Sequence, residues 1–214
     1  MPFPADDTLD MALSRHGIEL APEQTSTLDR YCRLLWDWNE KLNLTRHIDY
    51  EKFVSRDLVD SQVLARNLET GERVLDVGTG GGVPGIVLAV LRGDLQVALC
   101  ESVVKKARAV EQIVRDLGLP LTVFHRRAED LLSEKPFDTL VARAVAPLAK
   151  LLTWLEPHWG SFDRLLAIKG PQWLAERQEA RDRNLLHHLQ LRKLDTWPLP
   201  GTESESVLLE IRPK

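Results

Sequence analysis

Apolar residues in the first 69 positions recur at helical spacing, without the alternation typical of a strand. The clearest pattern follows Pro22, a residue that suits the first turn of a helix. Apolar side chains then recur every three or four positions and mark one helix face: Leu28, Tyr31, Leu35, Trp38 and Leu42. We expect further helices over residues 6–16 and 49–67, and therefore an N-terminal helical extension over residues 1–69.

From residue 70 the pattern changes to short apolar runs that alternate with longer segments of helical character. The short runs predict strands: 73–77, 95–100, 121–124, 138–142 and 165–169. The longer segments predict helices: 84–92, 105–117, 147–159 and 171–189. Two last apolar runs, 191–197 and 207–211, predict an antiparallel hairpin. Strands separated by helices favour a mostly parallel sheet, so we expect residues 70–214 to form an α/β domain with seven strands.

Composition and charge restrict the possible partners. The 214 residues carry a net charge of −4, so any nucleic-acid partner has to meet a local basic patch. No apolar run reaches the roughly 20 residues needed to cross a bilayer, and the first residues lack a secretion signal. Cys32 and Cys100 fall in different elements, and no cysteine–histidine cluster has metal spacing. We expect a cytoplasmic monomer without disulfide, metal or membrane contact.

The stretch with the clearest chemical content follows the first predicted strand. Five glycines fall among the eight residues from Gly78 to Gly85, directly before an apolar helix. Glycine allows a tight turn and a close approach of the backbone, and the next helix start offers free N–H groups to a ligand. Gly80–Gly85 matches the G-x-G-x-x-G pattern of dinucleotide sites, and Glu101 lies where a ribose-binding acid is expected.

S-adenosylmethionine (AdoMet) fits the same stretch better than a dinucleotide does. The relevant pattern is two apolar residues, an acid and alternate glycines: Val74, Leu75, Asp76, Gly78, Gly80 and Gly82. Asp76 at the strand end suits a ligand with an ammonium and a sulfonium, but it would repel a pyrophosphate. Pro84 also removes one N–H from a phosphate cradle. The stretch favours AdoMet, with an NAD(P)-dependent oxidoreductase or a glycine turn without a ligand as the alternatives.

Further motifs occur in a characteristic order along the chain: Asn43-Leu44-Thr45, Arg56-x-x-x-Asp60-Ser61, Asp76–Gly85, Arg127-Ala128-Glu129, Ala142-Arg143-Ala144 and Lys169-Gly170. In this the chain resembles the glucose-inhibited division protein B family, the bacterial small-subunit rRNA guanine-N7 methyltransferases. The resemblance implies a Rossmann-like class I methyltransferase fold, AdoMet as cofactor, and 16S rRNA within the 30S subunit as partner, with guanine 527 as the target. The chain departs from the family pattern at three positions: Asp57, Ala142 and Ser206.

The resemblance also suggests roles for the residues at the ends of the strands. Asp76 would hold the methionine end of AdoMet, directly or through a water molecule, unless it only places a charge at the helix N-terminus on the turn. Glu101 would accept both ribose hydroxyls. The alternative for Glu101 is a surface ion pair with Lys105. Ala128 and Glu129 would lie beside the adenine, unless they only begin a helix. The complete set of candidate cofactor residues is Asp76, Gly78, Thr79, Gly80, Gly82, Pro84, Glu101, Ala128, Glu129 and Arg143.

Arg143 and Lys169 are the catalytic candidates. Arg143 follows the fourth predicted strand, where amino-group methyltransferases carry an N/D-P-P-Y/F motif that is absent from this chain. Neither cysteine is placed to act as the nucleophile that cytosine-carbon methylation requires. Methylation of guanine N7 requires neither that motif nor a cysteine nucleophile, because the N7 lone pair is already free. Arg143 would then contact guanine O6 or a phosphate, unless it pairs with Asp138 or another acid. Lys169 would contact a phosphate or lie free on the surface.

A basic rim is expected to contact RNA through Arg46, Arg56, Arg126 and Arg127, and His47 could extend it. For each of these residues taken alone, a solvated surface position is an equally good interpretation. The alternative to an enzyme is a ribosome-associated RNA-binding module that keeps the fold without the activity.

Overall fold

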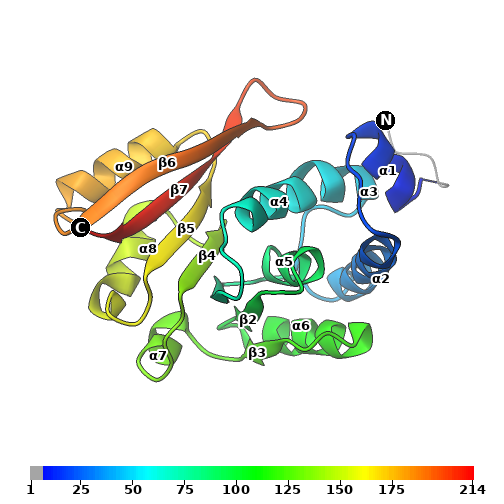
Figure 1. Cartoon of the computed structure of the whole chain (residues 1–214), viewed down its shortest axis with the longest axis horizontal. Coiled ribbons are helices and arrows are strands. Elements are labelled where there is room, and N and C mark those ends of the chain that lie inside the picture. Colours follow the sequence, from blue (N-terminus) through cyan, green and yellow to red (C-terminus); the bar gives the residue numbers. More distant parts are fainter. Residues whose placement is uncertain (1–6) are drawn as a thin grey trace.

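The computed structural model describes residues 7–214, and Figure 1 shows this part of the chain arranged around one sheet. In these residues seven strands follow the order β3-β2-β1-β4-β5-β7-β6. The strands are β1 Arg73–Val77, β2 Gln96–Cys100, β3 Thr122–Phe124, β4 Thr139–Arg143, β5 Arg164–Lys169, β6 Leu189–Pro198 and β7 Glu205–Pro213. Strands β1 to β5 pair in parallel, whereas β7 runs antiparallel to both β5 and β6. The predicted Rossmann-like α/β fold with a C-terminal antiparallel hairpin is confirmed.

Helices cover both faces of the sheet, because the side chains of each strand alternate between two hydrophobic cores. The first face carries the helices α1 Leu9–Arg15, α2 Pro22–Asn39, α3 Tyr50–Lys52, η1 Phe53–Leu58, α4 Val59–Arg66, α5 Gly85–Leu91 and α6 Val104–Leu117. The second face carries α7 Ala128–Leu132, α8 Leu148–Leu155, the short 3-10 helix η2 Glu156–His158 and α9 Trp173–Asp182. The helix expected over 49–67 therefore exists, but it contains the π-helical segment η1 between α3 and α4.

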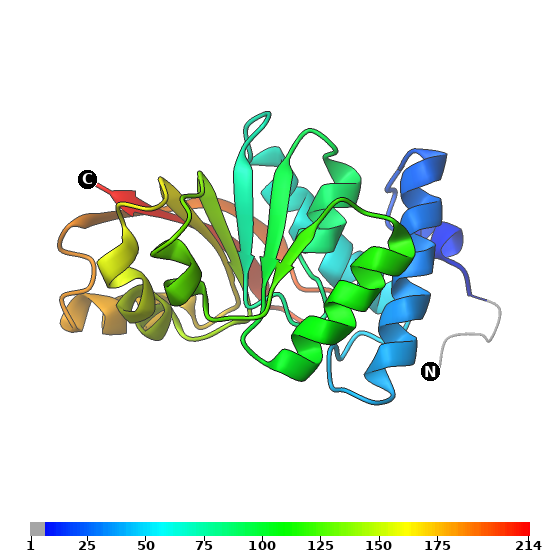
Figure 2. The same cartoon turned by 90° about the horizontal axis from the view of Figure 1, so that it is seen from below.

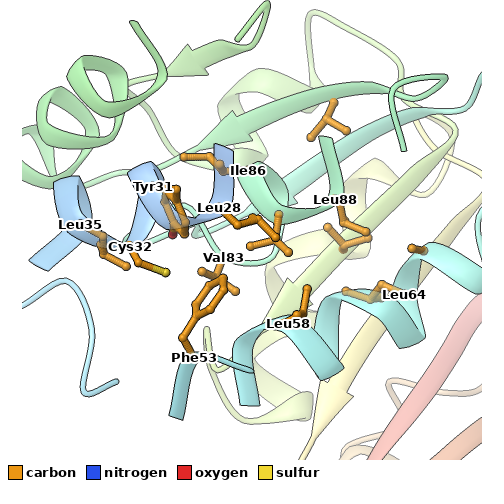
Figure 3. Close-up of a cluster of buried hydrophobic side chains, with 14 of the residues drawn as sticks. Leu28, Tyr31, Cys32, Leu35, Phe53, Leu58, Leu64, Val83, Ile86 and Leu88 are labelled. Atoms are coloured by element: carbon orange, nitrogen blue, oxygen red, sulfur yellow. The ribbon is translucent and has the colours of Figure 1, made fainter. Parts of the chain in front are cut away.

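The N-terminal helices share a core with the sheet. Figure 3 shows Leu28 and Tyr31 of α2 facing Val83 and Ile86, which lie in and after the glycine turn. The Tyr31 hydroxyl is fully buried and donates a hydrogen bond to the Gly81 carbonyl, at 2.9 Å. In Figure 2 the blue helix α2 lies alongside the green helix α6. A domain boundary between residues 69 and 70 stays a prediction, since side chains from both sides pack into one core.

The prediction for residues 171–189 was wrong in its second half, because α9 ends at Asp182. Asn184 takes a positive φ of 60°, and the Leu185 N–H bonds back to the Ala180 carbonyl. This bond is typical of a Schellman motif, in which asparagine here occupies the position that is more often glycine. The five-residue helix α7 was not predicted as an element, and the start of the helix expected over 6–16 lies outside the described residues.

Candidate functional site

The glycine turn between β1 and α5 is built around the Asp76 side chain. One carboxylate oxygen, Oδ2, accepts hydrogen bonds from the Thr79 hydroxyl at 2.5 Å and from the Gly85 N–H at 2.8 Å. A Cβ on Gly85 would lie 2.1 Å from the Leu99 side chain, so only glycine fits there. Asp76 is buried, and this burial raises its pKa to about 6 although both hydrogen bonds oppose the shift. Asp76 thus holds the turn from inside.

A cavity of about 410 Å³ opens at the carboxyl ends of the parallel strands, beside this turn. It brings together most of the predicted site residues: Gly78, Thr79, Gly80, Glu101, Arg126, Arg127, Ala128, Glu129 and Arg143. Gly80 has a φ of +58°, and the nearest atom to a Cβ placed on it would be the Leu44 carbonyl oxygen, 3.9 Å away. A side chain on Gly80 would therefore project into space that a ligand could fill.

Glu101 directly follows β2 and turns its carboxylate toward the glycine turn. Its two oxygens accept the Gly80 N–H at 3.1 Å and the Val103 N–H at 2.8 Å, and the residue is only 7% exposed. The alternative ion pair with Lys105 does not form in residues 7–214. Each carboxylate oxygen can accept a second donor, so Glu101 keeps capacity for two hydroxyl groups.

The start of α7 forms another part of the cavity lining. Ala128 is buried there, Arg127 is exposed, and Arg126 pairs with Glu134 at 2.7 Å. Ala128 and Glu129 begin a helix and also line the cavity, and their place beside an adenine stays a prediction. Cys100 also lines the cavity, and burial raises its pKa to about 12.

Arg143 is the last residue of β4. Its side chain reaches two carboxylates, those of Asp57 in η1 and Asp60 in α4. Its Nη1 atom lies 2.6 Å from Asp57 Oδ1 and donates to Asp60 Oδ2 at 3.1 Å. Within residues 7–214, the hydrogen bond and ion pairs of Arg143 all involve Nη1, so the Nε and Nη2 edge is left to the cavity. Asp138, the acid named as a possible partner, pairs with Arg73 instead. The expectation of another acid was correct.

The charges of this cluster support one another. Burial lowers the pKa of Arg143, but the two carboxylates outweigh that effect and raise it above its ordinary value. Burial would likewise raise the pKa of Asp57, yet Arg143 and His47 together hold it below its usual range. Asp60 differs, because burial raises its pKa in spite of Arg143. We therefore regard Asp57 as the ionised partner of Arg143.

Several predicted residues lie outside the cavity lining. The Lys169 ammonium is bound to Glu176 at 2.8 Å and to the Ala146 carbonyl at 2.6 Å, so it is neither on the surface nor free for a phosphate. A Cβ on Gly82 would meet Ile86 at 2.5 Å, so this glycine faces the protein core. The remaining predicted residues outside the lining are Asp76, Pro84, Arg46 and Arg56. Arg46 is exposed and Arg56 is half-buried.

The three departures from the family pattern are all buried. Asp57 is fully buried against Arg143, Ala142 is 2% exposed in β4, and Ser206 is 5% exposed in β7. None of these three side chains is therefore available on the surface for RNA contact.

The structure adds cavity residues that the sequence did not assign to the site: Leu35, Leu44, Thr45, Gly81, Val83, Ser102, Lys106, Val145 and Trp154. The Asn43-Leu44-Thr45 motif was a usable signal for two of them. The Asn39 side chain accepts the Leu44 and Thr45 N–H groups, which holds this loop against the glycine turn. Lys106 and Trp154 gave no local signal, because their places depend on how α6 and α8 pack.

Metal ligands and membrane spans are both missing from residues 7–214. In this range no group of three or more histidine, cysteine, aspartate or glutamate side chains is arranged to hold a metal ion. Nor does any helix there have the length and apolar character needed to cross a membrane.

Comparisons with known proteins agree with this geometry. The GidB family model, described as rRNA small subunit methyltransferase G, matches residues 24–198. The Ribosomal RNA small subunit methyltransferase G of Rhodopirellula baltica is 48% identical over 200 residues, covering 94% of this chain and 87% of the relative. Its counterpart from Escherichia fergusonii is 35% identical over 206 residues, covering 96% and 97%.

Solved structures support the fold. A SAM-dependent O-methyltransferase from Thermotoga maritima superposes with a TM-score of 0.53 at 20% identity, covering 82% of this chain and 70% of the other. An rRNA methylase from Streptococcus thermophilus gives a TM-score of 0.51 at 17% identity, covering 72% and 94%. With a family model that spans most of its length and relatives of this similarity, the chain belongs to the GidB family, rRNA small subunit methyltransferase G.

Proposed function

We propose that this chain transfers the methyl group of AdoMet to N7 of a guanine in 16S rRNA, with position 527 as the target. The observation that carries the proposal is Arg143, which is held on one side by two carboxylates and offers its other edge to the cavity beside the glycine turn. A guanidinium has no acceptor and keeps its proton, so Arg143 can bind and orient a base but cannot deprotonate one.

The residues of the cavity suit AdoMet. Glu101 has acceptor capacity for the two ribose hydroxyls, and Gly80 leaves room for the methionine portion. Ala128 and Glu129 line the end where an adenine would lie. The carboxylates of Asp76 and Glu101 favour the positive charges of AdoMet and would oppose the phosphates of a dinucleotide. The SAM-dependent neighbour from Thermotoga maritima supports the same cofactor.

The acceptor chemistry follows from what the site offers. AdoMet supplies an electrophilic methyl group on a sulfonium, and guanine N7 carries a free lone pair in the ring plane. Arg143 can donate to guanine O6 through Nε or Nη2 and leave N7 unblocked. The Cys100 thiol donates to the Arg126 carbonyl, and its pKa of about 12 keeps it neutral, which disfavours covalent attack on a cytosine. Positioning then provides most of the rate acceleration.

The partner we propose is the 30S subunit, assembled or assembling, in the cytoplasm, with the enzyme acting as a monomer. Lys106, Arg126 and Arg127 line the cavity. Arg46 is exposed and directly follows Thr45, which also lines the cavity. These cations could contact phosphates, but the net charge of −4 opposes tight binding to naked RNA. Lys169 is not part of this proposal, because its ammonium is already held inside the protein.

The product of the reaction tests this proposal. Purified protein, labelled AdoMet and 30S subunits from cells without this methyltransferase are expected to yield 7-methylguanosine, and naked 16S rRNA should react more slowly. Digestion to nucleosides followed by mass spectrometry identifies the methylated atom. A methyl group on N1, N2 or a cytosine would contradict the proposal. AdoMet or rRNA binding without transfer would favour the non-catalytic module, and nicotinamide binding would favour the oxidoreductase.

Substitution of Gly80 tests the position of the cofactor. The Gly80→Ala methyl group would stand in the cavity, so AdoMet affinity should fall about tenfold, or about 1.4 kcal/mol. Gly118→Ala is the matched control, since Gly118 also has a positive φ, +70°, and a Cβ there would meet no atom within 4 Å, but it ends α6 away from the cavity. Calorimetric titration should show normal affinity for the control. Equal affinities for both variants would mean that the cofactor lies elsewhere.

Substitution of Arg143 separates binding from methyl transfer. In Arg143→Lys one ammonium can pair with Asp57 and Asp60, but no second edge remains for the base. The single-turnover rate should fall about 100-fold through lost orientation, with AdoMet affinity changed less than about threefold. Arg164→Lys is the control. Arg164 lies between Glu72 and Glu210 at the other end of the parallel strands, and its side chain has the same 18% exposure as that of Arg143. If both variants lose transfer equally, Arg143 has only a structural role.

A further inference from the structure

Asp57 joins two walls of the cavity although it does not line the cavity itself. It lies in the π-helical segment η1 and is fully buried. A single oxygen, Oδ1, lies 2.6 Å from Arg143 Nη1 and 2.8 Å from His47 Nδ1. Because Asp57 is an ionised acceptor, the His47 ring nitrogen is the donor. One atom therefore ties the end of β4 to the loop that follows α2.

His47 belongs to a loop whose other residues, Leu44 and Thr45, line the cavity as Arg143 does. Its backbone N–H donates to the Thr45 hydroxyl at 3.0 Å, and its carbonyl accepts the Trp36 indole N–H at 2.8 Å. Leu44 and Thr45 line the cavity, and the Leu44 carbonyl oxygen faces Gly80 and Gly81. The ring of His47 is 24% exposed, so its hydrogen bond to Asp57 is the inner anchor of a loop that is otherwise near solvent.

The burial of Asp57 makes these two contacts obligatory. Its second oxygen, Oδ2, has no hydrogen-bond partner in the described part of the chain, so the charge depends on Arg143 and His47 at Oδ1. Removing the partners of a buried carboxylate strongly destabilises the folded protein. Asp60 does not share this arrangement, because its other oxygen accepts the buried Trp197 indole N–H at 3.0 Å, which ties it to β6.

We infer that Asp57 is a positioning residue for methyl transfer, which sets the distance between Arg143 and the Leu44–Thr45 wall of the cavity, beside the glycine turn. This inference rests on the proposed function, since it assigns Arg143 to the guanine and the glycine turn to the cofactor. Asp60 and Trp197 can keep Arg143 near its place without Asp57, but within residues 7–214 neither forms a hydrogen bond or ion pair with the loop. Loss of the Asp57 charge should therefore change the spacing of the walls more than the fold.

Asp57→Asn keeps the shape of the side chain and removes the charge. The single-turnover rate on 30S subunits should fall about 100-fold, the size expected when reacting groups shift by about 1 Å, while AdoMet affinity stays within about threefold. Asp138→Asn is the matched control, because Asp138 precedes β4 at its other end and forms an exposed pair with Arg73. That control should transfer methyl groups at the normal rate.

Variants of His47 keep the inference testable if Asp57→Asn does not fold. His47→Asn places an N–H donor near the Nδ1 position and should keep most of the transfer rate. His47→Phe keeps a ring without the donor and should lose as much as Asp57→Asn. The double variant Asp57→Asn/His47→Phe should be no slower than the slower single variant, since both changes break one link.

Three results would overturn the inference: a normal rate for His47→Phe, fully additive losses in the double variant, or a matching loss of AdoMet affinity. A wild-type protein that makes no 7-methylguanosine would instead contradict the proposed function, so the two failures are distinguishable.

Discussion

The site depends on the cost of burying charge. Arg143, Asp57 and Asp60 lie between the N-terminal helices and the end of β4, where an unpaired charge would be strongly destabilising. These three buried charges are tolerated because one guanidinium nitrogen of Arg143, Nη1, pairs with both carboxylates. The same constraint leaves its other edge without a protein partner among residues 7–214, beside the cavity. The arrangement that stabilises the cluster therefore also presents a donor pair to a substrate.

A second buried acid organises the cofactor side in a similar way. Asp76 commits its Oδ2 atom to the glycine turn, and Glu101 reaches the same turn from the next strand through the Gly80 N–H. Carboxylates thus hold both the backbone of the glycine turn and the guanidinium of Arg143 beside the cavity. The N-terminal helices close the cavity through Leu35 and Leu44. Those helices pack against the sheet because their apolar faces share one hydrophobic core with the segment that follows the glycine turn.

The sequence predicted most of the sheet because each parallel strand is a continuous apolar run between polar or glycine residues. It failed at residues 183–189, where Asn184 ends α9 with a backbone conformation that asparagine adopts less readily than glycine. It also placed Glu101 and Gly80 correctly at one edge, since parallel strands end together. The partners of Arg143 and Lys169 were not predictable, because Asp57, Asp60 and Glu176 reach them through helix packing that no local pattern encodes.

We expect this site to work by positioning and not by acid–base catalysis. Guanine N7 has no proton to lose, and Arg143 does not titrate near neutral pH. Asp76, with a pKa of about 6, is mostly ionised above that value. The direct measurement is the single-turnover rate of methyl transfer to 30S subunits, at saturating AdoMet, as a function of pH. We predict a rate that is nearly constant from about pH 6.5 to 8.5, and a slope near tenfold per pH unit would contradict the account, because it would require a general base.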